Sequence, residues 1–256
     1  ERNIFLIMYT IGIDLGGTNI AAGIVDENYN IVKKASTPTN ASRSADEITA
    51  DIAALCKKLT EDMELTLKDI QSIGIATPGT ANSQTGEILY ANNLPFNNYP
   101  MEQKLSDFLG YTGRVHIAND ANAAAKAEAV AGAAKGSKYS VMITLGTGVG
   151  GGIILDGQVY SGFNHAGAEL GHIVIVKDGR QCTCGRRGCW ETYSSATGLI
   201  RTTRVRLEEA REAGRKTVIE EMIGGDLDRI SGRTAFRAMQ SGDELGAEVV
   251  DEYISY

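Results

Sequence analysis

The sequence predicts an α/β protein built of two related lobes. A strand, a glycine-rich turn and a second strand open the chain at "IGIDLGGTNIAAGIVD" (residues 11–26), and the same order returns at "VMITLGTGVGGGIILD" (residues 141–156). When the two stretches are aligned at an offset of 130, five of the sixteen positions are identical. Two apolar hairpins can share that many residues by chance, but a repeat at this separation favours two duplicated halves that each begin with a phosphate-type turn.

Helices and strands alternate between the two repeats. Ser44 and Glu47 have the spacing of a capping box, and apolar residues follow at helical intervals, which predicts a helix. Residues 70–79 are predicted to form a buried strand that ends in a Pro-Gly turn. Residues 114–134 are predicted to form a strand, a short turn and an alanine-rich helix.

The alanine-rich helix marks the expected boundary between the lobes. We expect an N-terminal lobe over residues 8–118 and a C-terminal lobe over residues 119–256, with a ligand bound between them. Residues 190–214 are predicted to form one long helix, and residues 231–242 and 243–256 two more. A second lobe built like the first needs a further parallel strand after a crossover helix. Because none follows, we expect this lobe to be incomplete at its C-terminal end.

Composition narrows the class of protein. The chain has 256 residues, of which 43% are apolar, and this is enough for one large core or two smaller ones. A net charge of -7 and a pI near 5.1 argue against nucleic acid or an anionic membrane as the main partner. No apolar run approaches the ~20 residues of a membrane helix. Four cysteines, three of them clustered, suit a reducing compartment better than a secreted disulfide framework, so we expect a cytoplasmic protein.

The segment "HIVIVKDGRQCTCGRRGC" (residues 172–189) carries one imidazole and three thiols. These are the donors of a closed Cys3His zinc site: His172, Cys182, Cys184 and Cys189. Gly185 and Gly188 allow the loop to turn tightly around an ion, and soft thiolates favour zinc over magnesium or calcium. The alternative is a set of free thiols on a flexible loop. Three exposed thiols within eight residues would oxidise readily, which favours zinc.

Two glycine-rich turns predict phosphate binding. "DLGGTN" (residues 14–19) and "LGTGVGGG" (residues 145–152) can both direct backbone N–H groups at phosphate oxygens. The first lacks the lysine of a Walker motif and the helix that follows one. Either turn alone is also compatible with a plain hairpin. Together they favour a nucleoside triphosphate held between the lobes, with Asp14 facing its magnesium ion directly or through water.

Asp120 lies where an apolar strand ends and a helix begins, beside Asn119. Two interpretations are open. In the first, the carboxylate caps the helix. In the second, it is a general base in the cleft between the lobes and takes the proton from an attacking hydroxyl. The pattern alone does not separate these interpretations, and they are compatible.

Five motifs occur in an order that resembles the ROK family of bacterial sugar kinases and sugar-responsive repressors. They are "IDLGGTN", "NDANAAA", "LGTGVGGGI", "GAELGHI" and "CTCGRRGCWE". Within the family they are most similar to ATP-dependent glucokinases, and the resemblance extends from about Met8 to the end. It implies a duplicated actin-like, ribonuclease H-like ATPase fold with a ligand cleft between two lobes. It also implies transfer of the γ-phosphoryl group of Mg-ATP to the 6-hydroxyl of a hexose, with glucose as the first candidate.

The resemblance implies a role for each motif residue. Asp120 would be the catalytic base. The hexose would be bound by Asn119, Asp120, Glu169, His172, Glu191 and, through its backbone, Gly79. The nucleotide and its magnesium ion would be bound by Asp14, Gly16, Gly17, Thr18, Asn19, Gly146, Thr147 and Gly148. His172 would bind structural Zn²⁺ with one ring nitrogen and face the sugar with the other, so that the metal supports the sugar pocket.

The resemblance also leaves other functions open. A sugar-sensing repressor carries a winged helix-turn-helix domain before the first strand, and here only about ten residues precede that strand. An Hsp70-type ATPase would leave the cysteine loop and Glu169 unexplained. N-acetylmannosamine, N-acetylglucosamine, fructose and allose are alternative substrates to glucose.

Two expectations concern the whole protein. Family members are commonly dimers or tetramers, so we expect a homo-oligomer. They continue past the position of Tyr256 into a strand and a glycine-rich turn that flank the adenosine. A chain that stops at Tyr256 is expected to keep the zinc and sugar residues but to bind ATP weakly.

Overall fold

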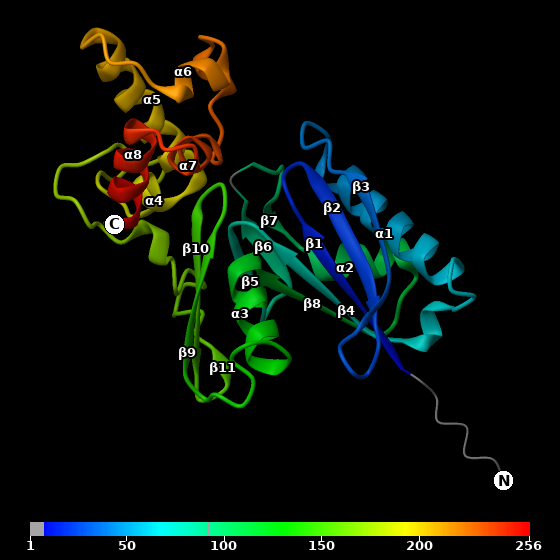
Figure 1. Cartoon of the computed structure of the whole chain (residues 1–256). Coiled ribbons are helices and arrows are strands. Elements are labelled where there is room, and N and C mark those ends of the chain that lie inside the picture. The colour runs from blue at the N-terminus through cyan, green and yellow to red at the C-terminus, as the bar shows by residue number, and fades with distance from the viewer. Residues whose placement is uncertain (1–7, 92) are drawn as a thin grey trace. The chain divides into compact units, whose positions relative to one another are not determined.

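The computed structural model describes residues 8–91 and 93–256 (Figure 1). They form two compact units. The first comprises residues 8–140 and 153–167, and the second comprises residues 141–152 and 168–256. The expected lobes, with a boundary between residues 118 and 119, were defined by the sequence repeat, whereas these units are defined by compactness. The boundary between the lobes therefore stays a prediction.

A five-stranded mixed sheet forms the centre of the first unit, with the strand order β3–β2–β1–β4–β8. Its strands are β1 (Tyr9–Leu15), β2 (Asn19–Val25), β3 (Ile31–Pro38), β4 (Ile70–Thr77) and β8 (Arg114–Asn119). β2 runs antiparallel to β1 and β3, whereas β4 runs parallel to β1 and β8. Side chains alternate between the two faces along each strand. Ile13 and Leu15 are therefore buried, while Asp14 between them is exposed on the opposite face.

Two helices, α1 (Ala45–Glu61) and α2 (Met101–Leu109), bury their apolar faces in the same core cluster as this sheet. The predicted capping box is confirmed, because Ser44 and Glu47 each bond the other's backbone N–H at the start of α1. The predicted inner face of α1 is also buried: Ile48, Ile52, Leu55 and Leu59.

A small sheet and two further helical elements complete the first unit. The sheet has the order β5–β6–β7 and consists of β5 (Thr80–Asn82), β6 (Glu87–Tyr90) and β7 (Asn97–Tyr99). The predicted alanine-rich helix is α3 (Asp120–Val130), and a 3-10 helix, η1, covers Leu67–Asp69. We did not predict the small sheet, because its strands have only three or four residues and carry little periodic signal.

The second repeat also forms a strand, a turn and a strand, β9 (Ser140–Leu145) and β10 (Val149–Leu155). Both ends of β10 lie 130 residues after the ends of β2, which supports the duplication. The predicted Asp-Gly turn is confirmed: Asp156 and Gly157 have φ angles of 48° and 76° and lead into β11 (Gln158–Val159).

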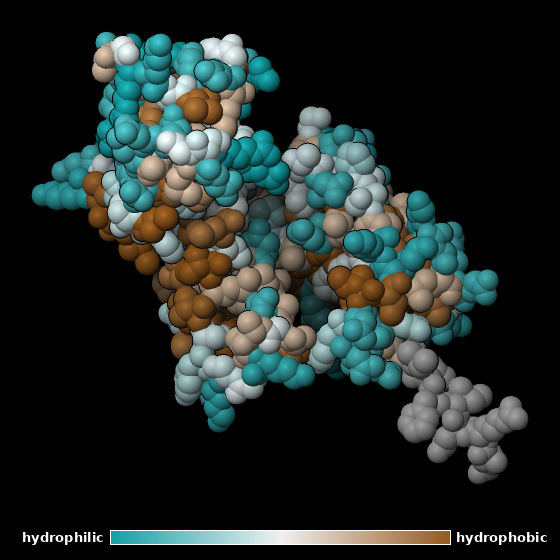
Figure 2. Space-filling model, in the orientation of Figure 1, coloured by the Kyte–Doolittle hydropathy of each residue, from teal (hydrophilic) through white to brown (hydrophobic). Residues whose placement is uncertain are grey.

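One face of β9 remains exposed. Its alternate residues Val141, Ile143 and Leu145 keep 63%, 37% and 60% of their surface accessible. Figure 2 shows hydrophobic side chains gathered on the surface over β9 and β10. None of the described residues covers these three side chains fully.

Helices dominate the rest of the second unit. They are α4 (Glu191–Ser194), α5 (Ala196–Glu212), α6 (Val218–Ile223), α7 (Thr234–Gln240) and α8 (Glu244–Ile254), with the 3-10 helices η2 (Leu170–His172) and η3 (Leu227–Arg229). Two apolar clusters hold them together, one of which centres on Leu207 and Ile219 and the other on Leu199 and Val249. The helices predicted over residues 231–242 and 243–256 correspond to α7 and α8.

The prediction of one long helix over residues 190–214 is wrong. The helix is interrupted at Ser195, whose backbone is extended with φ -88° and ψ 168°. Its hydroxyl accepts a hydrogen bond from Gly198 N–H (3.0 Å), so Ser195 caps a new helix, α5. A serine hydroxyl can bind a nearby backbone N–H in place of the helical hydrogen bond. At Ser195 this cap forms, and the helix does not continue through it.

Within the described ranges, every helix is too short or too polar to cross a lipid bilayer.

Replacement of Ser44 by alanine tests the capping box. The Ser44→Ala variant should lose about 1 kcal/mol of unfolding free energy, since the hydroxyl that accepts from Glu47 N–H and donates to Glu47 Oε2 disappears. Urea titration followed by circular dichroism measures the change. Ser83→Ala removes the same atom from an exposed turn and should change the midpoint by less than a third as much. Equal effects of the two substitutions would contradict the prediction.

Candidate functional site

The first glycine-rich turn joins β1 to β2 and is fixed by Thr39. Gly16 N–H donates to Asn19 O (3.0 Å), which closes the turn. The fully buried Thr39 donates its hydroxyl to Gly16 O (2.6 Å) and its N–H to Thr18 O (3.0 Å). Since Gly16 N–H is committed to the turn, a phosphate here would meet the exposed residues Gly17 and Thr18. The sequence contained no signal for the role of Thr39.

The structure brings two of the predicted acidic residues together in the first unit. Asp14 is the penultimate residue of β1 and lies on its exposed face, and Asp120 is the first residue of α3. The pKa of Asp14 is raised, mainly by partial desolvation and also by the negative charge of Asp120. A divalent cation beside Asp14 would offset both effects, because a positive charge stabilises the carboxylate.

Asn119, rather than Asp120, caps α3. The side-chain oxygen of Asn119 accepts a hydrogen bond from Asn122 N–H (3.1 Å), and its amide nitrogen donates to Gly79 O (3.0 Å). The capping interpretation of Asp120 is therefore corrected. Asp120 is the next residue, and within the described part of the chain its Oδ1 accepts a hydrogen bond from the adjacent Ala121 N–H (2.8 Å).

Gly79 has a structural role at the same point. Its φ angle is 83°, and a Cβ here would overlap Tyr90 O and lie 2.9 Å from Ala91 Cα. Only glycine fits both the conformation and the space. The carbonyl oxygen of Gly79 accepts a hydrogen bond from Asn119, so the predicted contact of Gly79 with the sugar would use the second lone pair of that oxygen or the N–H of Gly79.

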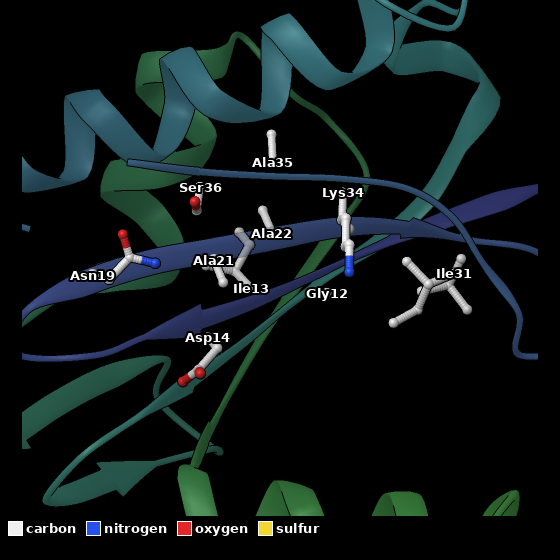
Figure 3. A pocket seen from close by; sticks show the side chains of 12 residues that line it. Gly12, Ile13, Asp14, Asn19, Ala21, Ala22, Ile31, Lys34, Ala35 and Ser36 are labelled. Carbon is white, nitrogen blue, oxygen red and sulfur yellow. The ribbon is translucent and has the colours of Figure 1, made fainter. Parts of the chain in front are cut away.

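A pocket of about 740 Å³ lies on the exposed face of β1, β2 and β3. Asp14 and Asn19 provide polar groups in it, and Lys34 lies farther along β3 (Figure 3). Small residues form much of its lining, among them Gly12, Ala21, Ala22, Gly23 and Ala35. Two of the predicted nucleotide residues thus have open space beside them.

In the second unit, the second glycine-rich turn contacts a predicted sugar residue. Gly146 N–H donates to Gly148 O (3.0 Å), a closure like that of the first turn. Val149 N–H, at the start of β10, donates to Glu191 Oε2 (3.1 Å). A Cβ on Gly148 would overlap the same carboxylate oxygen. The structure therefore brings Glu191 and the turn at residues 146–148 together.

The segment "ELGH" lies against the same start of β10. Glu169 is exposed and precedes the short helix η2, which ends at His172. A Cβ on Gly171 would overlap Val149 O, and one on Gly151 would lie 2.6 Å from Ala168 O. These two glycines allow the backbones to approach, and their steric role was not predicted.

The four predicted metal ligands form one cluster. The ligand atoms of His172, Cys182, Cys184 and Cys189 all lie within 4.8 Å of one another. Cys182 Sγ is 3.6 Å from His172 Nδ1, and Cys184 Sγ is 3.6 Å from Cys189 Sγ. Tetrahedral zinc with Zn–S of about 2.3 Å and Zn–N of about 2.0–2.1 Å implies edges of about 3.8 Å between sulfurs and about 3.6 Å between sulfur and nitrogen. The donor set and its spacing fit zinc.

The local electrostatics favour a thiolate in this cluster. Desolvation would raise the pKa of Cys184, but hydrogen bonds from the backbone and side chain of Arg186 outweigh it and lower that pKa to about 6. Desolvation raises the pKa of Cys189 to about 12. A bound cation would stabilise the remaining thiolates, since a metal replaces the proton of a coordinating thiol.

Glycine shapes the cysteine loop as predicted. Gly185 and Gly188 have φ angles of 88° and 81°, and a Cβ on Gly188 would overlap Val176 O. Cys182 N–H donates to Arg186 O (2.9 Å), which closes the turn between two of the cysteines.

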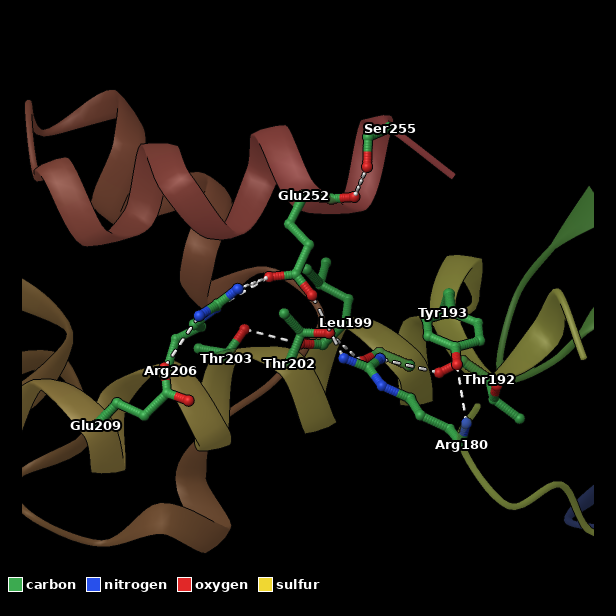
Figure 4. Close-up of polar contacts among 11 residues, drawn as sticks. Arg180, Thr192, Tyr193, Leu199, Thr202, Thr203, Arg206, Glu209, Glu252 and Ser255 are labelled. Carbon is green, nitrogen blue, oxygen red and sulfur yellow. Dashed lines mark hydrogen bonds and ion pairs between the residues drawn. The ribbon is translucent and has the colours of Figure 1, made fainter. Parts of the chain in front are cut away.

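Arg180 anchors the loop to the helices that follow it (Figure 4). Its guanidinium lies 4.6 Å from the ring centre of Tyr193 and donates to Thr192 O (3.1 Å). It also pairs with Glu252 of α8 (3.5 Å), and Glu252 pairs with Arg206 of α5 (2.6 Å). The loop is thereby tied to α4, α5 and α8.

The predicted site residues are divided between the two units. Gly79, Asn119 and Asp120 belong to the first unit with the first glycine-rich turn, and Glu169, His172 and Glu191 belong to the second. Each set is assembled within its own unit by the contacts described above.

Comparison with known proteins gives a consistent result. The family model described as "ROK family" matches residues 10–256. Glucokinase from Streptomyces coelicolor is 37% identical over 246 residues, which cover 95% of this chain and 73% of that protein. N-acetylmannosamine kinase from Citrobacter koseri is 36% identical over 197 residues, which cover 75% of this chain and 63% of that protein.

A solved structure is also similar. The ROK family glucokinase from Streptomyces griseus in complex with glucose and AMPPNP has a TM-score of 0.76 and 34% identity, and the match covers 96% of this chain and 75% of that chain. This likeness confirms the expected actin-like α/β fold. Because the family model spans nearly the whole sequence and the same motifs carry the contacts described above, this chain belongs to the ROK family.

Proposed function

We propose that this protein is an ATP-dependent hexose kinase that phosphorylates glucose on its 6-hydroxyl. The observation that carries the proposal is the pair Asp14, at the start of the first glycine-rich turn, and Asp120, which lie close enough to interact. One carboxylate suits the magnesium ion of a nucleotide, and the other suits the proton of an acceptor hydroxyl. Similarity to glucokinases at 34% and 37% identity supports this assignment.

In this mechanism the protein mainly positions the two substrates. Asp120 accepts the proton of the 6-hydroxyl while the new oxygen–phosphorus bond forms and the bond from the γ-phosphorus to ADP breaks. The backbone N–H groups of the two glycine-rich turns bind the phosphate oxygens. Asp14 would hold a magnesium ion directly or through water, and the ion would supply positive charge that offsets the charge of the phosphates.

A neutral sugar needs an oriented donor or acceptor for each hydroxyl. Asn119 uses one acceptor site on Asn122 and one donor on Gly79, so it retains one of each for ring hydroxyls. Glu191 uses Oε2 on Val149 N–H and offers Oε1 to the sugar. Glu169 and His172 complete the set on the second unit.

The Cys3His cluster is proposed to hold structural zinc. The ion would be bound by His172, Cys182, Cys184 and Cys189. The ion would cross-link these four side chains and so hold the loop and the ring of His172 in one orientation. Because Nδ1 of His172 faces the cysteines, Nε2 is the nitrogen available to a sugar hydroxyl. The unpaired thiols fit the reducing cytoplasm, where we place the protein.

A coupled assay against a panel of hexoses tests the proposed function. With ATP and magnesium, glucose should be converted to a product that glucose-6-phosphate dehydrogenase oxidises. N-acetylmannosamine, N-acetylglucosamine, fructose and allose are the comparison substrates. If a full-length preparation that is folded and contains zinc phosphorylates none of these sugars, the kinase assignment is excluded.

The Asp120→Asn variant tests the general base. We expect kcat to fall about a hundredfold to ten-thousandfold, because no carboxylate accepts the proton. The dissociation constant for glucose should stay within about tenfold of the wild-type value, since asparagine keeps the size of the side chain. The control is Asp107→Asn, which removes an exposed carboxylate on α2 and should leave kcat unchanged. Loss of glucose binding in Asp120→Asn would show that this carboxylate acts in sugar binding rather than as the base.

Zinc removal tests the support role of the metal. The purified protein should contain about one zinc per chain by elemental analysis, as expected for one closed site. After chelation, the melting temperature should fall by at least about 5 °C, and glucose binding should weaken in calorimetry. Added zinc should restore both properties, whereas added calcium should not. Wild-type glucose affinity in a verified metal-free sample would refute this role.

A further inference from the structure

We propose that the segment Glu191–Thr197 couples hexose binding to the shape of the phosphate turn at residues 146–148, and that Thr197 is a positioning residue of that turn. The inference rests on the proposed function, because it assigns the hexose to Glu191 and the nucleotide phosphates to the turn. It adds a residue outside the predicted set and a physical link between the two substrates.

Three hydrogen bonds connect this segment to the turn. Val149 N–H donates to Glu191 Oε2 (3.1 Å), and Ala196 N–H donates to Gly146 O (2.9 Å). The hydroxyl of Thr197 donates to Thr147 O (2.8 Å). The seven-residue segment thus contacts the beginning, the middle and the end of the turn.

The segment itself is held rigidly. Thr192 N–H and its hydroxyl donate to Cys189 O (3.0 and 2.7 Å), so α4 begins on the backbone of a cysteine of the cluster. The hydroxyl of Tyr253 donates to Ser194 O (3.0 Å), and the buried Ser195 caps α5. A displacement of the Glu191 side chain, at the start of the segment, is therefore transmitted to the turn, because the segment itself does not deform.

The carboxylate of Glu191 is shared between the proposed sugar site and the phosphate turn. Its Oε2 binds Val149 N–H, and the absence of a side chain at Gly148 lets the turn pack directly on the same oxygen. A sugar hydroxyl on Oε1 would orient the carboxylate and, through it, the first N–H of β10. Coupling between two binding sites is reciprocal, so phosphates on the turn would also favour the sugar.

Thr197 provides the clearest test because it is not among the residues assigned to either ligand. Its side chain is exposed, near the start of α5, and its hydroxyl binds only the turn among the contacts of the described residues. Valine has the same shape without the donor. Serine keeps the donor without the methyl group. Val205→Thr is a matched control, since Val205 is exposed on the same helix, away from the turn.

The first experiment uses the full-length protein and measures the dissociation constants of Mg-AMPPNP and of glucose by calorimetry. Thr197→Val should weaken AMPPNP binding roughly three- to tenfold, which corresponds to one hydrogen bond, and leave glucose binding alone within about twofold. Thr197→Ser should restore the wild-type value, and Val205→Thr should match it. Unchanged AMPPNP affinity in Thr197→Val, or equal losses for both ligands, would overturn the positioning role.

The second experiment measures AMPPNP affinity with and without saturating glucose. In the wild type, glucose should tighten AMPPNP binding about fivefold or more, and in Glu191→Gln this ratio should fall toward one. If the wild type binds both ligands but the ratio is one, the coupling is refuted and the kinase assignment stands. If the wild type binds neither ligand, the proposed function itself fails.

Discussion

The start of β10 constrains much of the second unit, because two segments approach its backbone at distances that exclude a side chain. A Cβ at position 148 would overlap the carboxylate of Glu191, and a Cβ at position 171 would overlap Val149 O. The amide of Val149 then has a carboxylate as its acceptor. A charged acceptor makes a stronger hydrogen bond than a neutral one, so this contact contributes to order as well as position. The glycines of the turn are consequently needed for packing as well as for phosphate access.

The two glycine-rich turns share one construction despite their different sequences. In each, the N–H of the first glycine closes the turn on a carbonyl two or three residues later, as in Gly16 and Gly146. Each turn is then fixed from outside by a threonine hydroxyl on a backbone carbonyl, Thr39 in the first and Thr197 in the second. The duplication inferred from spacing thus extends to the means of support, although the two threonines occupy unrelated positions in the sequence.

Caps and turns that depend on residues close together in the sequence could be predicted from the sequence. The capping box at Ser44, the Asp156–Gly157 turn and the tight turns at Gly185 and Gly188 were all predicted from short-range rules. The sequence left open whether Asp120 caps α3, and the cap is Asn119, because both residue types favour that position and only the backbone decides between them. The break at Ser195 was missed because the hydrophobic spacing continues across it.

Contacts between distant segments could not be predicted in this way. The overlap of a side chain at position 148 with Glu191 joins residues 43 positions apart and leaves no periodic trace. It has a consequence for divergence within the family. The carboxylate of Glu191 fills the space that a side chain at position 148 would need. A shorter acid at position 191 would leave that space open, and only then would alanine be tolerated at position 148. Positions 148 and 191 are therefore expected to covary. A replacement of Glu191 that changes the sugar preference would be accompanied by a replacement in the phosphate turn.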